Sequence, residues 1–200
     1  MAWKVVDGLI VPESFNGHPV LDFCNTRTAW ATPTPKEYLV SHAHLTLWSA
    51  LNGLLPAAEV PRLRGAAEAR PGPAAAIVAR TVAFRSALYA VLVGPATDRD
   101  WTLVDTEVRQ AARHVALCAG TPASWTVTTR GLDRPLRAVA WAAGQFLTTD
   151  AAGTVSACGS ADCGWVFANP TGRRRWCRMA LCGNRAKARR HAARRRAGAR

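Results

Sequence analysis

Apolar residues recur every three or four positions along much of the chain before residue 150, which is the spacing of one helix face. The runs between glycine, proline and asparagine breaks predict a mostly helical body. The predicted helices cover residues 34–51, 57–69, 73–93, 98–120 and 133–150, the second a short one within a loop rich in proline, glycine and alanine. Between the last two, Trp125 and Val127 alternate with polar residues and predict a short strand over 124–129.

The predicted helix over residues 34–51 carries the clearest start signal in the body. Thr34 is a suitable N-cap, Pro35 suits the first helical position, and Glu37 stands where a capping box places an acid. An Asn-Gly pair after residue 51 predicts the end of the helix.

The character of the chain changes after Asp150. Residues 151–157 carry no long apolar side chain, and beyond them cysteines and arginines replace the helical pattern. We therefore predict two domains, a helical one over residues 1–150 and a small module over residues 151–200.

Charge separates the same two parts. The net charge is +13, yet residues 1–150 hold 14 Lys/Arg against 12 Asp/Glu, whereas residues 151–200 hold 12 Lys/Arg against Asp162 alone. Such a cation density favours a polyanionic partner, which is DNA, RNA or an anionic membrane surface. The alternative is a solvated basic tail without a partner.

Four of the six cysteines form two short pairs. Cys158 and Cys163 are separated by four residues, Cys177 and Cys182 by another four, and the spacer between the pairs has thirteen. Without a secretion signal, clustered cysteines are more often metal ligands than disulfides. An all-cysteine set fits one structural zinc ion with no open coordination position. A redox or disulfide site is the alternative.

The residues around these cysteines support a small metal-centred module. Gly159 and Gly164 permit tight turns, and an apolar cluster over the metal is expected from Trp165, Val166, Phe167 and Trp176. A metal would supply most of the stability of so small a unit. The two isolated cysteines, Cys24 and Cys118, are predicted to be small buried hydrophobes.

The cations lie around and after the cysteines. The stretch after Cys182 is rich in alanine and arginine, which favours a helix whose start is fixed by the metal. We predict Arg185, Arg189 and Arg196 near one face, with Lys187, Arg190 and Arg194 beside it. The predicted nucleic-acid contacts are Arg173, Arg174, Arg175, Arg178, Asn184, Arg185, Lys187, Arg189 and Arg190. Asn184 and Arg185 are candidates to read base edges, although Asn184 equally suits a structural role in the turn.

The run from Cys163 to His191, CGWVFANPTGRRRWCRMALCGNRAKARRH, resembles the CGNR zinc finger, which is named for the tetrapeptide that begins here at Cys182. The resemblance covers residues 155–195. Three positions depart from the family. The family usually has an acid where this chain has Asn169, and Ser or Thr followed by a basic residue where this chain has residues 170–172, PTG. An aromatic residue is common in the family where this chain has His191.

The N-terminal part resembles the ABATE domain, because residues 21–26, LDFCNT, are similar to that domain's signature. The resemblance implies a DNA-binding finger behind a helical regulatory domain, in a family described as stress-induced transcription regulators. Asp22, Asn25 and Thr26 then have two interpretations. They line a pocket for a small-molecule effector, or they pin the chain as short polar side chains do, which we favour.

The expected fold class is mainly α: a helical N-terminal domain with a short β element, followed by a four-cysteine zinc finger with a short hairpin and a basic C-terminal helix. The expected function is DNA-binding transcription regulation, with a body that dimerises, binds an effector, or both. RNA binding, with Trp165 and Trp176 stacking on bases, and redox sensing through the zinc thiolates are alternatives.

We expect neither an enzyme nor a membrane protein. None of the five histidines belongs to a Ser/His/Asp or His-Glu-x-x-His pattern, and no phosphate-binding glycine motif occurs. No run of 18 apolar residues occurs, and the first residues do not read as a signal peptide. The expected location is the cytoplasm.

Overall fold

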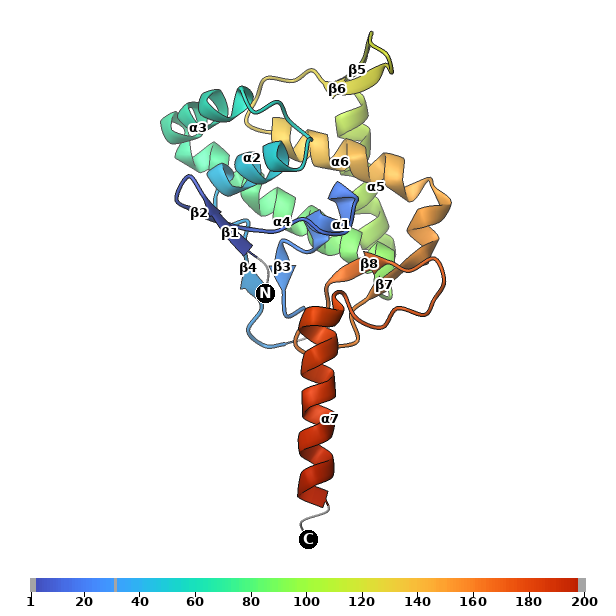
Figure 1. Ribbon diagram of the computed structural model, residues 1–200. Helices are drawn as coiled ribbons and strands as arrows, with labels where there is room; N and C mark the ends of the chain where they lie inside the picture. Colours follow the sequence, from blue (N-terminus) through green and yellow to red (C-terminus); the bar gives the residue numbers. More distant parts are fainter. Residues whose placement is uncertain (1–2, 31, 198–200) are drawn as a thin grey trace.

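The computed structural model describes residues 3–30 and 32–197, the side chain of Ala197 excepted. Its helices are α1 (Pro19–Cys24), α2 (His42–Leu51), α3 (Glu59–Ala69), α4 (Pro71–Val93), α5 (Asp98–Ala112), α6 (Arg134–Leu147) and α7 (Asn184–Ala197), with a 3₁₀ turn η1 (Asp150–Thr154) and a π turn η2 (Met179–Gly183). The mainly helical fold class is confirmed (Figure 1).

The strands pair as short antiparallel hairpins. The pairs are β1 (Trp3–Val6) with β2 (Leu9–Pro12), β3 (Arg27–Thr28) with β4 (Lys36–Glu37), β5 (Val115–Cys118) with β6 (Ser124–Val127), and β7 (Val155–Ala157) with β8 (Val166–Ala168). Figure 1 shows β5 and β6 at one end of the molecule and α7 at the other.

The core of the body lies where α1, α2, α4, α5 and α6 meet. Phe23, Trp48 and Phe84 are at most 1% exposed and lie ring against ring, with Phe23 5.6 Å from Trp48 and 5.9 Å from Phe84 between centroids. Burial of one such side chain stabilises the fold by roughly 1.5–3 kcal/mol. Val166 of β8 belongs to the same cluster, so the β7–β8 hairpin packs directly on the body.

Helix α4 is long and apolar enough to cross a membrane, judged by length and composition alone, and 33% of its most apolar window is buried. Two arginines within it are ion-paired, Arg80 with Glu107 at 2.8 Å and Arg85 with Glu37. Phe84 and Leu88 of the same helix lie in the core. These contacts describe a core helix of the body.

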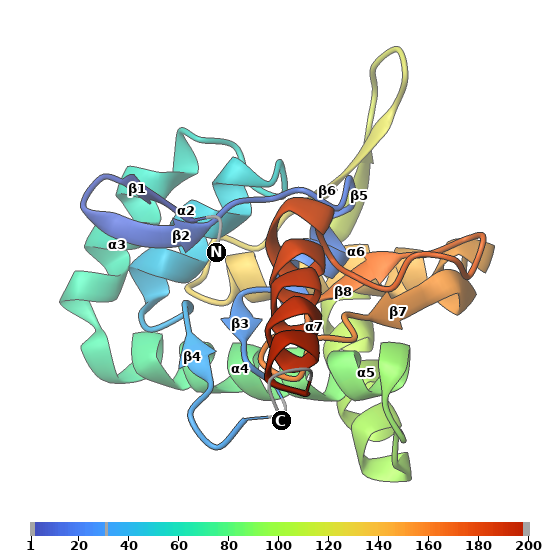
Figure 2. The same ribbon diagram turned by 60° about the horizontal axis from the view of Figure 1, so that its bottom comes forward.

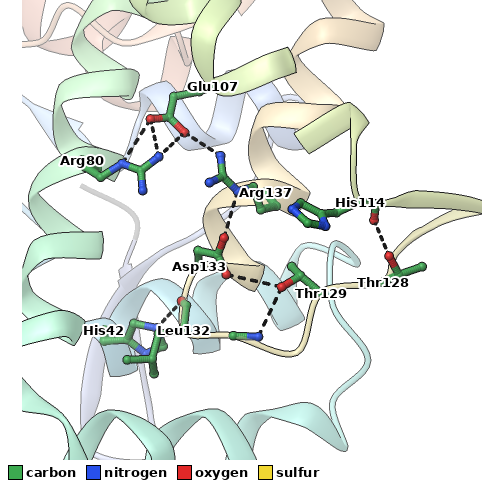
Figure 3. A network of polar contacts seen from close by, with 10 residues as sticks. His42, Arg80, Glu107, His114, Thr128, Thr129, Leu132, Asp133 and Arg137 are labelled. Atoms are coloured by element: carbon green, nitrogen blue, oxygen red, sulfur yellow. Dashed lines mark hydrogen bonds and ion pairs between the residues drawn. The ribbon is translucent and has the colours of Figure 1, made fainter. Parts of the chain in front are cut away.

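A partly buried ionic network ties α4, α5 and α6 together (Figure 3). Glu107, 6% exposed, accepts hydrogen bonds from Arg80 at 2.8 Å and from Arg137 at 3.0 Å. Arg137 also donates to Asp133 at 3.0 Å. Because each charge has a hydrogen-bonded partner, the network satisfies the polar groups that would otherwise oppose burial between these helices.

The predicted helix over 34–51 is wrong in its first part. Residues 36 and 37 form strand β4, and α2 begins at His42 with Ser41 as its N-cap, whose side chain accepts from the backbone N–H of His44. Glu37 accepts instead from the backbone N–H of Leu39 at 2.8 Å and from Arg85. Tertiary ion pairing therefore overrides the local cap signal at residues 34–37.

The predicted helix over 98–120 is also too long. It ends at Ala112, and residues 115–118 form β5, which pairs with β6 so that Leu117 lies opposite Trp125. Cys118 consequently lies on this hairpin, half-buried, and not in the core as predicted, whereas Cys24 is fully buried. The helices predicted over 57–69, 73–93 and 133–150 and the strand at 124 are confirmed within a few residues.

Candidate metal centre and basic helix

Four cysteine sulfurs converge at the end of the β7–β8 hairpin. All four sulfurs lie within 4.8 Å of one another, with 3.7 Å between Cys163 and Cys177 and 3.6 Å between Cys177 and Cys182. A tetrahedral zinc ion with bonds of about 2.3 Å requires sulfurs about 3.8 Å apart. A disulfide requires about 2.05 Å, so these are free thiols. The donor set fits one structural zinc ion.

Backbone hydrogen bonds place the two cysteine pairs. The N–H of Cys158 donates to Trp165 O at 2.8 Å, and the N–H of Gly159 donates to Arg175 O at 3.0 Å, which joins the two halves of the site. Gly183 follows the last ligand, and because a Cβ there would lie 2.3 Å from Met179 Sδ, the flexible Met179 side chain would have to move to admit one.

An apolar cluster covers the sulfurs, as predicted, but with one different member. Trp165, Phe167 and the half-buried Trp176 pack against the cysteines, together with Phe15 from the N-terminal segment. Val166 faces the helical body instead, because side chains alternate across a strand. The prediction for Val166 was therefore wrong.

The crowded thiols share protons when no cation is present. Hydrogen bonds from Cys163 and Cys177 lower the pKa of Cys158, and the hydrogen bond to Cys158 raises the pKa of Cys163 and of Cys177. Four thiolates this close repel one another strongly. A divalent cation is the partner that lets all of them ionise together, and it would displace the shared protons.

Arg185 extends the site beyond the four ligands. Its Nη2 donates to Cys182 Sγ at 3.3 Å, and this hydrogen bond raises the pKa of Arg185. Such a donor orients a metal-bound thiolate and partly balances its charge. Arg185 was predicted as a nucleic-acid contact, and the structure places it against the metal cluster.

Replacing Arg185 with glutamine is expected to weaken zinc binding about 10- to 100-fold, because a group in direct contact with a ligand is lost. Competition with a chromophoric zinc chelator measures the change in affinity. The matched control is Arg190→Gln, which removes an exposed arginine of the same helix that touches no ligand. Equal zinc affinity in both variants would contradict a role for Arg185 at the thiolate.

The three arginines before Cys177, residues 173–175, form a loop that we call the arginine loop. Arg174 folds inward: its Nε donates to Trp176 O at 3.0 Å, and its guanidinium lies 4.3 Å from the centre of the Phe167 ring. Arg175 lies over Trp176 at 5.8 Å, and Arg173 is exposed. All three side chains are thus exposed, and Arg174 in addition closes the loop through its contacts with the finger.

Sequence reasoning missed the side chain that shapes this loop. Asn169, 8% exposed, donates to Arg174 O at 3.0 Å and accepts from the Arg174 N–H at 3.0 Å. A single amide thus fixes the backbone of the loop. Its place where the family usually has an acid was the signal that could have drawn attention to it.

Of the other predicted nucleic-acid contacts, some bind elsewhere in the protein and some are exposed to solvent. Arg178 lies over the Phe15 ring at 5.0 Å and 3.7 Å from Glu13, and Arg189 pairs with Asp162. Asn184 donates to Ala180 O at 3.5 Å within the turn. Lys187 and Arg190 are exposed on α7.

The three polar residues near the start of the chain make structural contacts. The Asp22 carboxylate accepts from the N–H of Phe15 at 3.2 Å and from Asn16, and burial raises its pKa. Thr26 donates to Phe23 O at 2.6 Å and accepts from Arg85 at 2.8 Å. Asp22 also borders an open hollow. The effector pocket predicted for these residues stays a prediction.

Asn25 joins the body to the finger. Its Oδ1 accepts from the Val166 N–H at 2.8 Å and its Nδ2 donates to Val166 O at 3.0 Å. The side chain at the C-cap of α1 thus pairs with the backbone of β8. Nearby, the Trp165 indole donates to Arg27 O at 3.0 Å and the Tyr89 hydroxyl donates to Gly164 O at 2.7 Å. The finger is thus bonded to three segments of the body.

Two family profiles match the sequence, and together they cover most of it. Residues 17–150 match the ABATE profile, described as "Putative stress-induced transcription regulator". Residues 155–195 match the CGNR zinc finger, which contains the four clustered cysteines. No match to a curated protein was found.

Proposed function

Since the chain belongs to the ABATE family of transcription regulators and ends in a CGNR zinc finger, we propose that it regulates transcription by binding DNA through α7 and the arginine loop. The observation that carries this proposal is the charge and placement of α7. Its 14 residues include six arginines and one lysine and no acid. Figures 1 and 2 show that it extends away from the rest of the molecule, beside other elements only near its start.

The zinc centre gives this helix a fixed direction. Cys182 is a ligand of the site, and the chain passes from it through Gly183 directly into α7. A helix so basic has no apolar face to bury, so its stable surroundings are water and phosphate. The closed four-cysteine site serves structure and not catalysis, since no coordination position is left for a substrate.

Duplex DNA is favoured over single-stranded RNA by the position of the tryptophans. Base stacking needs an exposed ring face, whereas Trp165 is 2% exposed and Trp176 lies half-buried under Arg175. The exposed side chains of the arginine loop and of α7 are mainly charged, which suits a phosphate backbone. The helical body would then serve regulation, by an effector or by dimerisation.

Fluorescence anisotropy of a labelled duplex, titrated with the zinc-loaded full chain at several salt concentrations, tests the proposal. We expect tight binding at low salt and a log–log salt slope of several units, because each contacted phosphate contributes about 0.9. Unlabelled single-stranded RNA of the same length serves as competitor. Binding that ignores salt, or RNA that displaces the duplex at lower concentration than unlabelled duplex does, would refute DNA as the partner.

A further inference from the structure

Six of the seven cations of α7 are divided between two opposite faces of the helix, and the seventh, Arg195, falls between these faces. Successive residues turn by about 100°, so Arg185, Arg189 and Arg196 fall within about 40° of one another. On the same helix Lys187, Arg190 and Arg194 fall within about 60°, on the other side of the axis. The prediction that the second set lies beside the first was therefore wrong.

The first set, which we call the inner face, is held by the zinc finger at Arg185 and Arg189, whereas Arg196, near the other end of α7, is exposed. Arg185 donates to Cys182 Sγ at 3.3 Å, and Arg189 pairs with the carboxylate of Asp162 in the loop between the first two cysteines. This ion pair, helped by the charge of Arg185, lowers the pKa of Asp162. Arg185 and Arg189 thus hold the start of α7 against the loop between Cys158 and Cys163.

The second set, which we call the outer face, consists of Lys187, Arg190 and Arg194. All three are exposed, and within residues 3–30 and 32–197 no carboxylate lies within ion-pair distance of them. Their spacing of three and four residues places them in one row along the axis. The row is about 10 Å long, a length over which duplex DNA presents about six phosphate charges.

We propose that duplex DNA lies along the outer face of α7, with its phosphates contacted by Lys187, Arg190 and Arg194, while Arg185 and Arg189 act as positioning residues. This inference rests on the proposed function and specifies its contact surface. It also removes Arg185 from direct reading of bases, because the guanidinium is held at the Cys182 sulfur. Recognition through the outer face is then recognition of the DNA backbone.

Two double variants with equal charge test the assignment of faces. Arg190→Gln/Arg194→Gln removes two arginines from the outer face, and Arg189→Gln/Arg196→Gln removes two from the inner face of the same helix. Duplex affinity and salt slope are measured by anisotropy for both variants and the unaltered chain, each shown to hold zinc. We expect the outer-face variant to lose about 1.8 from the salt slope and at least about tenfold in affinity, and the inner-face variant to lose clearly less on both measures.

The outcomes separate this inference from the proposed function. If both variants lose slope and affinity equally, the net charge of α7 governs binding and the face assignment is overturned. A larger loss in the inner-face variant overturns it as well. If the unaltered chain does not bind the duplex, the proposed function fails and the contact surface fails with it.

Discussion

The Cys177→Ser variant will lose its zinc and, with it, the fixed placement of α7. Cys177 is fully buried and lies 3.7 Å and 3.6 Å from the sulfurs of Cys163 and Cys182, so it joins the two cysteine pairs. A serine hydroxyl is a poor zinc ligand, since it stays protonated near neutral pH. Structural zinc contributes about 10–16 kcal/mol of binding free energy in isolated fingers, and most of the stability of this small unit depends on it.

Release of zinc to a metallochromic chelator measures this effect, together with protease sensitivity of the segment after residue 150. We expect the variant to hold no zinc under chelator concentrations that leave the unaltered chain loaded, and to be cleaved readily in the finger. Cys118→Ser is the matched control, because Cys118 is a half-buried thiol outside the cluster. Full zinc occupancy in Cys177→Ser would contradict the ligand assignment.

The Arg85→Met variant will lose about 3 kcal/mol of stability, the second large effect that the structure predicts. Arg85 is fully buried and donates to Thr26 at 2.8 Å and to Glu37 at 2.7 Å. Its loss leaves the Glu37 carboxylate without its cation, although that side chain is 31% exposed and water compensates in part. Glu37 lies in β4 and Thr26 directly precedes β3, and β3 carries Arg27, whose carbonyl oxygen accepts from the Trp165 indole of the finger.

Thermal and urea unfolding of the zinc-loaded chain measure this loss, with Arg99→Met, an exposed arginine, as control. A loss of less than about 1 kcal/mol would show that Arg85 is dispensable for the stability of the body.

The difference in unfolding free energy between the Arg85→Met variant and the unaltered chain should also depend on pH. Burial alone raises the pKa of Glu37, and its bonds to Arg85 lower it below its usual value. The stability that this pair contributes is therefore present above the unfolded pKa of Glu37 and is lost as the pH falls through the folded pKa. At that low pH the unfolding free energies of the variant and of the unaltered chain should approach each other.

The features that the sequence predicts well are those encoded locally. The four ligands are recognisable because both pairs lie within a few residues, and α4 because an apolar run ends at a Gly-Pro pair. Helix α7 follows from its alanine and arginine content directly after a ligand. In each case the residues that determine the element are neighbours in the chain.

The features that the sequence predicts poorly depend on residues that lie far apart in the chain. The cap signal at Thr34 is overridden because Glu37 pairs with Arg85, 48 residues away. The roles of the basic residues are not encoded locally either: Arg189 meets Asp162 27 residues earlier, and Asn25 meets Val166 across 141 residues. Net charge alone predicts a cationic helix, and only the folded finger shows that Arg185 and Arg189 are paired within it.

Native mass spectrometry of the full chain, purified under reducing conditions without chelator, tests the central claim most directly. We expect one zinc ion per chain, which is released when acid protonates the four cysteine thiolates. A chain that carries no zinc under these conditions, with its four clustered cysteines as free thiols, would contradict the metal site.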